Sequence, residues 1–144
     1  DVYKRQVQRA AQFPGGGLER MIDFNPEEQT ITIPVSQSVN PERLQNAGQL
    51  EMIVHQRWAI AILRVKSIDA KDGQAVVRFH EPESYLEFAH PWPQPVIGGE
   101  KGNSSFCLTN ALELLDQPGE WFQEYPSARF TIIRRQAKIW KQLK

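Results

Sequence analysis

The middle of the chain alternates polar and apolar residues with a period of two, which is typical of half-buried β-strands. Residues 30–35 (TITIPV) show the alternation first, and residues 50–58 (LEMIVHQRW) and 61–68 (AILRVKSI) show it most strongly. Within the last of these, Arg64 and Lys66 alternate with aliphatic residues, which puts charge on one face and bulk on the other. We therefore predict three strands that each turn one face toward a core.

Turn-forming residues separate these strands. Asp72 and Gly73 predict a tight hairpin turn, after which residues 74–80 (QAVVRFH) return as a strand. Residues 81–105 are so rich in proline, glycine and aromatic residues that we predict one long loop there. A further strand starts at residue 120 (EWF). Antiparallel elements of this kind indicate a mainly β fold, a small sandwich or curled sheet.

Two short helices are expected between the strands. Asn40 is a favourable N-cap, Pro41 fits the first helical position, and Glu42 lies near the positive end of the helix dipole. Asn110 is predicted to cap a second short helix over residues 111–115.

Composition favours one globular domain. The 144 residues are 40% hydrophobic and 10% aromatic, and no apolar run approaches the roughly 18 residues of a membrane span. Cys107 is the only cysteine, which excludes an internal disulfide, and we expect it to be a small buried hydrophobe. His55, His80 and His90 lack metal-binding spacing, so neither a metal nor a cofactor is expected.

Charge is distributed unevenly along the chain. Residues 128–144 hold six bases and no acid, and residues 1–6 hold two bases and one acid. Of the 17 bases and 17 acids, residues 7–127 therefore keep nine bases and sixteen acids, a net charge of −7. A body this acidic is a poor binder of nucleic acid.

Both ends look foreign to the rest. Residues 1–6 (DVYKRQ) resemble the translation of a transposon-end adaptor used in DNA library preparation. Residues 128–144 could form a basic amphipathic strand or helix, but codons exist for them that, shifted by one base, encode a strand and a Pro/Gly turn. We predict a single-base error near Ser127, which an intact reading frame in resequenced source DNA would contradict.

Two blocks of the chain resemble a known bacterial family. Residues 49–58 with 64–68 are similar to one block, and residues 109–122 (TNALELLDQPGEWF) are similar to the more distinctive one. The family comprises right-handed parallel β-helix proteins of the glycoside-hydrolase type, within the pectin-lyase-like superfamily, with a β-rich domain inserted early in the helix. Residues 9–14 (RAAQFP) resemble the stretch where the chain leaves that helix.

This resemblance, which covers about residues 8–127, together with the two foreign ends predicts four segments. Residues 1–6 are adaptor-derived, residues 7–24 lead in from the parent β-helix, residues 25–127 form the insertion domain, and residues 128–144 are a frameshifted tail. In the family, a Lys-hydrophobic-Tyr-Tyr strand follows the Pro-Gly-Glu-Trp block, and the shifted frame supplies such a strand here.

The resemblance also implies a function. Family members are similar to secreted or periplasmic enzymes that degrade polysaccharides, with catalytic carboxylates on β-helix coils. The chain is then a non-catalytic insertion domain that helps to shape the substrate cleft, with a polysaccharide or oligosaccharide as partner. A glycan-binding module and a structural or interaction domain remain alternatives. We expect no catalytic pair among the acids Glu81, Glu83, Glu87, Glu113, Asp116 and Glu120.

Tryptophan offers the best candidates for sugar contact. Trp92 follows His90 within a Pro-rich loop, whereas Trp58 and Trp121 lie on predicted strands. Exposed indole faces stack on sugar rings, although a buried tryptophan is an ordinary core anchor. His90, Trp92, Trp58 and Trp121 are therefore the predicted carbohydrate contacts.

Overall fold

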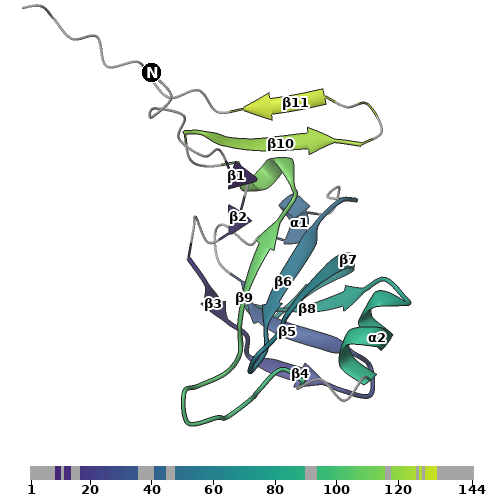
Figure 1. Ribbon diagram of the computed structural model, residues 1–144, viewed down its shortest axis with the longest axis vertical. Coiled ribbons are helices and arrows are strands. Elements are labelled where there is room, and N and C mark those ends of the chain that lie inside the picture. Colours follow the sequence, from purple (N-terminus) through teal and green to yellow (C-terminus); the bar gives the residue numbers. More distant parts are fainter. Residues whose placement is uncertain are drawn as a thin grey trace, which may run out of the picture.

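The computed structural model describes residues 9–10, 12–13, 17–35, 41–44, 48–89, 94–115, 118–125, 127 and 129–132. Within them, two sheets and three short helices form a mainly β fold (Figure 1). The larger sheet contains β2 (Gln12–Phe13), β3 (Glu19–Arg20), β4 (Asp23–Asn25), β5 (Thr30–Pro34), β6 (Glu51–His55), β7 (Ile60–Lys71), β8 (Gln74–Phe79) and β9 (Ser105–Thr109). The smaller sheet contains β1 (Arg9–Ala10), β10 (Glu120–Glu124) and β11 (Arg129–Ile132). The helices are α1 (Pro41–Leu44), α2 (Glu83–Ala89) and the 3₁₀ helix η2 (Leu112–Leu114).

Strand β7 connects the two halves of the larger sheet. The strand order is β2-β9-β6-β7-β8-β5-β4, with β3 also paired to β9, and the pairing is antiparallel throughout. The first part of β7 pairs with β6 and the second part with β8, and the register shifts between Val65 and Ser67. An extra residue in one strand bends it and increases its twist. The sheet can therefore curl around a single core, which confirms the predicted sandwich-like β fold.

The core is lined by alternate residues of both halves. On β7, Leu63 is 0% exposed and Val65 is 7% exposed, whereas Arg64 and Lys66 face solvent, as the alternating pattern predicted. The other fully enclosed aliphatic side chains of this cluster include Ile31, Ile33, Met52, Val54, Val77 and Leu108. Burying aliphatic side chains of this size contributes about 1.5–3 kcal/mol each relative to leaving them exposed.

Helix α2 corrects the prediction of one long loop over residues 81–105. It begins directly after Pro82, and its buried residues Ser84 and Phe88 are one helical turn apart. The Phe88 ring lies 4.9 Å from that of Phe24 and 5.8 Å from that of Phe79. The proline content concealed this short amphipathic segment, whose stability comes from packing on the core rather than from length.

The predicted hairpin turn and the predicted helix cap have different outcomes. Asp72 and Gly73 take φ values of 52° and 78°, so the predicted hairpin turn is confirmed. The predicted Asn110 cap is wrong, because Ala111 occupies the N-cap position of η2 without a side-chain hydrogen bond. Asn110 instead adopts a φ of 64°, a left-handed conformation that asparagine tolerates better than most residues.

The smaller sheet brings the two ends of the domain together. Strand β1 pairs in parallel with β10, with Arg9 opposite Glu120 and Ala10 opposite Trp121. Parallel neighbours need a long crossover connection, and here that connection is the whole larger sheet. Figure 1 shows the small sheet at one end of the molecule. Strand β11 pairs antiparallel with β10, and the proposed frameshift in this segment stays a prediction.

No described helix has the length and hydropathy of a membrane span.

Phe88 provides a direct test of the α2 packing. Phe88→Ala should destabilise the domain by about 3–5 kcal/mol, because it opens a cavity between Phe24 and Phe79. Urea unfolding measures the change. Tyr85→Ala is the control, since this side chain on the same helix is 61% exposed and its loss should cost about 0.5 kcal/mol or less. Equal effects of the two substitutions would contradict the packing of α2.

Candidate functional site

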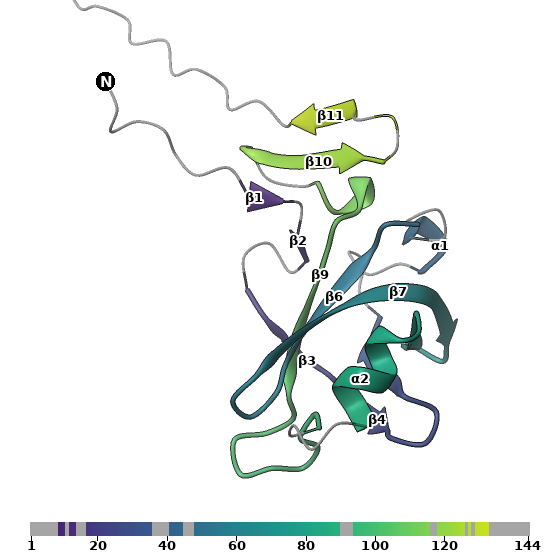
Figure 2. The ribbon, with the colours of Figure 1, turned by 45° about the vertical axis from the view of Figure 1, so that its right-hand side comes forward.

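Residues of the β6–β7 connection and of the loop before β9 line an open cleft of about 850 Å³. Figures 1 and 2 show these two segments at the end of the domain away from the small sheet. The residues that carry its chemistry are Arg20, Gln56, Arg57, Glu100, Lys101 and Asn103. We call this site the polar cleft.

Asn103 fixes one wall of the polar cleft. Its Nδ2 donates to the carbonyls of Met21 at 2.9 Å and Ile22 at 3.1 Å, and its Oδ1 accepts from the backbone N–H of Gly98 at 2.8 Å. The guanidinium of Arg20 donates to the Asn103 carbonyl. These bonds tie the loop to the N-terminal strands, so the wall is formed before any ligand arrives.

The same loop is also closed on itself. The Val96 N–H donates to Ser104 Oγ at 2.9 Å, and the Ser104 N–H donates to the Val96 carbonyl at 2.8 Å. Gly98 and Gly102 take φ values of 68° and 82°, which favour glycine at both positions. The glycine-rich run GGEKGN thus forms a defined turn that presents Glu100 and Lys101 to the cleft.

Gln56 is the unusual residue of the polar cleft. The residue is 9% exposed, and its buried side-chain atoms Oε1 and Nε2 have no hydrogen-bond partner among the described residues. Only its backbone N–H is satisfied locally, by the Ala59 carbonyl at 3.0 Å. A buried unpaired polar group costs about 1–3 kcal/mol. The domain therefore keeps an amide beside this cleft against its own stability.

The predicted sugar contacts fall in different places. Trp58 follows Arg57 of the polar cleft directly and is 66% exposed. Trp121 is half-buried on β10, and this strand lies beyond the other end of β6 from the β6–β7 connection that contains Trp58 (Figures 1 and 2). His90 and Trp92 lie outside the described residues. All four stay predictions.

The acidic residues considered in the sequence have separate environments. Glu83 Oε1 lies 2.5 Å from Arg64 Nε, and the hydrogen bond from that guanidinium lowers the pKa of Glu83. Glu120 is buried at 1% exposure, Glu81 and Glu113 are exposed, and Asp116 lies outside the described residues. Desolvation raises the pKa of Glu19 and of Glu51. Across the described part of the chain, no three of His, Cys, Asp and Glu are grouped to hold a metal.

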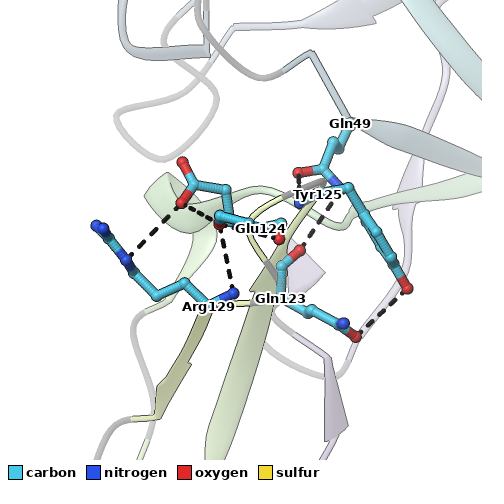
Figure 3. Close-up of polar contacts among 6 residues, drawn as sticks. Gln49, Gln123, Glu124, Tyr125 and Arg129 are labelled. Carbon is cyan, nitrogen blue, oxygen red and sulfur yellow. Dashed lines mark hydrogen bonds and ion pairs between the residues drawn. The ribbon is translucent and has the colours of Figure 1, made fainter.

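A second hollow of about 390 Å³ lies where the larger sheet meets β10. Figure 3 shows how Gln49 bridges this junction. Its Oε1 accepts from the Tyr125 N–H at 2.9 Å, and its Nε2 donates to the Gln123 carbonyl at 3.5 Å. These bonds hold the β10–β11 hairpin against the larger sheet, so we assign the second hollow a structural role.

Comparison with known proteins places this geometry in a family. The family model described as the GH141 insertion domain matches residues 2–134. The chain belongs to this GH141 family. A solved structure described as "Glycoside hydrolase" is 32% identical in sequence and superimposes with a TM-score of 0.76. The match covers 90% of this chain and 22% of that one. No curated protein matches the chain at a significant level.

The family accounts for the position of β1 and β10. An insertion domain has to leave and rejoin its host at neighbouring points, and the parallel pairing of Arg9 with Glu120 provides this. The resemblance to a glycoside-hydrolase insertion domain is thus confirmed. The sequence did not predict the polar cleft, because its three cations are far apart along the chain. Arg20 and Lys101 are separated by 81 positions, with Arg57 between them, and only folding brings the three together. The glycine-rich run with its two charges was the one local signal.

Gln56 gives a stability test of the polar cleft. Gln56→Met keeps the length of the side chain and removes both unpaired polar atoms, so it should stabilise the GH141 domain by about 1–2 kcal/mol. Thermal unfolding measures the change. Gln94→Met is the control that should destabilise, since Gln94 Nε2 donates to the Phe88 carbonyl at 3.0 Å. A loss of stability in Gln56→Met as large as in the control would show that the Gln56 amide is satisfied.

Proposed function

We propose that this GH141 insertion domain forms part of the substrate cleft of a secreted or periplasmic, polysaccharide-degrading glycoside hydrolase. In this role it supplies contacts to the glycan, and the parent β-helix supplies the catalytic carboxylates. The domain assignment and the likeness to a glycoside hydrolase support this proposal.

Exposure of Trp58 is the observation that carries the proposal. Trp58 is 66% exposed and directly follows Arg57, a lining residue of the open polar cleft whose wall is already fixed by the hydrogen bonds of Asn103. An exposed aromatic face next to hydrogen-bonding groups suits a sugar, which has an apolar ring face and polar edges. Because the wall of the cleft is already fixed, the protein loses less conformational entropy when a sugar binds.

One observation favours a structural role instead. Ile60 and Ile62 on β7 are each 60% exposed and follow Trp58 along the chain. Such an apolar strip can also pack against the remainder of a host enzyme, since the chain matches only 22% of the similar glycoside hydrolase. In that case Trp58 would be buried in the parent enzyme and would stabilise its fold instead of contacting substrate.

Kinetics of the full-length parent enzyme separate these roles. If Trp58 contacts substrate, Trp58→Ala should raise KM by about two- to tenfold and leave kcat nearly unchanged, because it removes a binding contact and not a reacting group. The midpoint of thermal unfolding should stay constant.

Tyr85→Ala is the matched control, since Tyr85 is a similarly exposed aromatic residue outside the polar cleft. It should leave both KM and kcat unchanged. A lower unfolding midpoint in Trp58→Ala, with an unaltered KM, would contradict the contact role and favour the structural one.

A further inference from the structure

The polar cleft concentrates positive charge within the acidic residues 7–127. Three of the nine bases of residues 7–127, Arg20, Arg57 and Lys101, line it, against one of the sixteen acids, Glu100. The cleft therefore carries a formal charge of +2 within a segment of −7. Because charges more than about 10 Å apart are largely screened at 0.1 M salt, the local charge governs what a bound group experiences.

Among the described residues, these three cations form no ion pair with a carboxylate. Elsewhere on the domain, Arg64 pairs with Glu83 at 2.5 Å and Arg78 with Asp69 at 2.6 Å. In the described part of the chain, Arg20, Arg57 and Lys101 have no such carboxylate partner. Arg20 is oriented by its bond to the Asn103 carbonyl, so one guanidinium is held at the wall of the cleft.

Hydrogen-bonding capacity accompanies the charge. Gln56 lines the same cleft and is nine-tenths buried, and its amide Oε1 and Nε2 are enclosed there without a hydrogen-bond partner among the described residues, which leaves one acceptor and two donors unused. A sugar hydroxyl can accept from one side of such an amide and donate to the other. Trp58, which is 66% exposed, directly follows the lining residue Arg57. The cleft thus combines positive charge with an unpaired amide, and an exposed aromatic residue is its neighbour in the chain.

We propose that the polar cleft binds a carboxylated sugar unit, a uronic acid of an acidic polysaccharide. Arg57 and Arg20 face the carboxylate, for which a guanidinium provides two parallel N–H donors. Lys101 adds charge from the opposite loop, Gln56 meets ring hydroxyls, and Trp58 flanks the sugar ring. This inference rests on the proposed function, in that the cleft has to face a glycan, and it adds the class of that glycan.

Affinity gel electrophoresis of the whole chain tests this binding. Polygalacturonate is the acidic probe, and its fully methyl-esterified form is the neutral one, since both share a backbone and differ in charge. We expect retardation by the free acid and much weaker retardation by the ester. The retardation should fall as NaCl is raised, because salt screens the contact.

Matched double variants locate the site. Arg57→Gln combined with Lys101→Gln should weaken binding of polygalacturonate at least about tenfold, since charge-assisted hydrogen bonds are lost. Arg78→Gln combined with Lys66→Gln removes the same charge from exposed residues outside the cleft and should change the affinity less than about twofold. Thermal unfolding of both variants, and of Lys101→Gln alone, verifies that the comparison is between folded proteins.

Several outcomes would overturn the carboxylate assignment. These are equal retardation by the acid and its ester, equal loss in the two double variants, no retardation by polygalacturonate, and retardation by dextran sulfate that matches polygalacturonate. None of them bears on the KM effect of Trp58→Ala in the parent enzyme, so the failure of this inference and the failure of the proposed function are distinguishable.

Discussion

Strand β7 has to pair with β6 over its first part and with β8 over its second part. The rest of the domain depends on the bend in β7 that allows both pairings. Its first five residues pair with β6 and its second part with β8, with the register shift between Val65 and Ser67 at the bend. Because of this bend, side chains from both halves reach one core. The pairing of β6 with β9, which puts His55 opposite Ser105, places the β6–β7 connection beside the loop before β9, and these two segments form the polar cleft.

Local patterns predicted the strands well, because a half-buried strand has to alternate. Leu63 and Val65 face the core, and Arg64 and Lys66 face water. The turn at Asp72 and Gly73 was equally predictable, since positive φ is a local requirement. Helix α2 was not, because a seven-residue helix depends on the packing of Phe88 against Phe24 and Phe79, which the proline-rich composition around it concealed.

The candidate site was less predictable than the fold. Of the predicted tryptophans, Trp58 is exposed and directly follows Arg57 of the polar cleft, and its contact with sugar stays a prediction. Trp121, however, lies at the far end of the domain on β10 (Figures 1 and 2). Arg20 and Gln56 carried no signal in the sequence, because an arginine after a glutamate and a glutamine after a histidine are ordinary pairs. Their significance comes from the bond of Arg20 to Asn103 and from the burial of the Gln56 amide, both of which are products of the tertiary fold.

We propose above all that the polar cleft faces a glycan in the complete glycoside hydrolase. A crystal structure of the full-length parent with a bound oligosaccharide would show this. We expect a sugar ring within about 4 Å of Trp58, with a polar group of that sugar hydrogen-bonded to Arg57 or Gln56. A structure in which the host enzyme itself covers Trp58 and fills the cleft would contradict it.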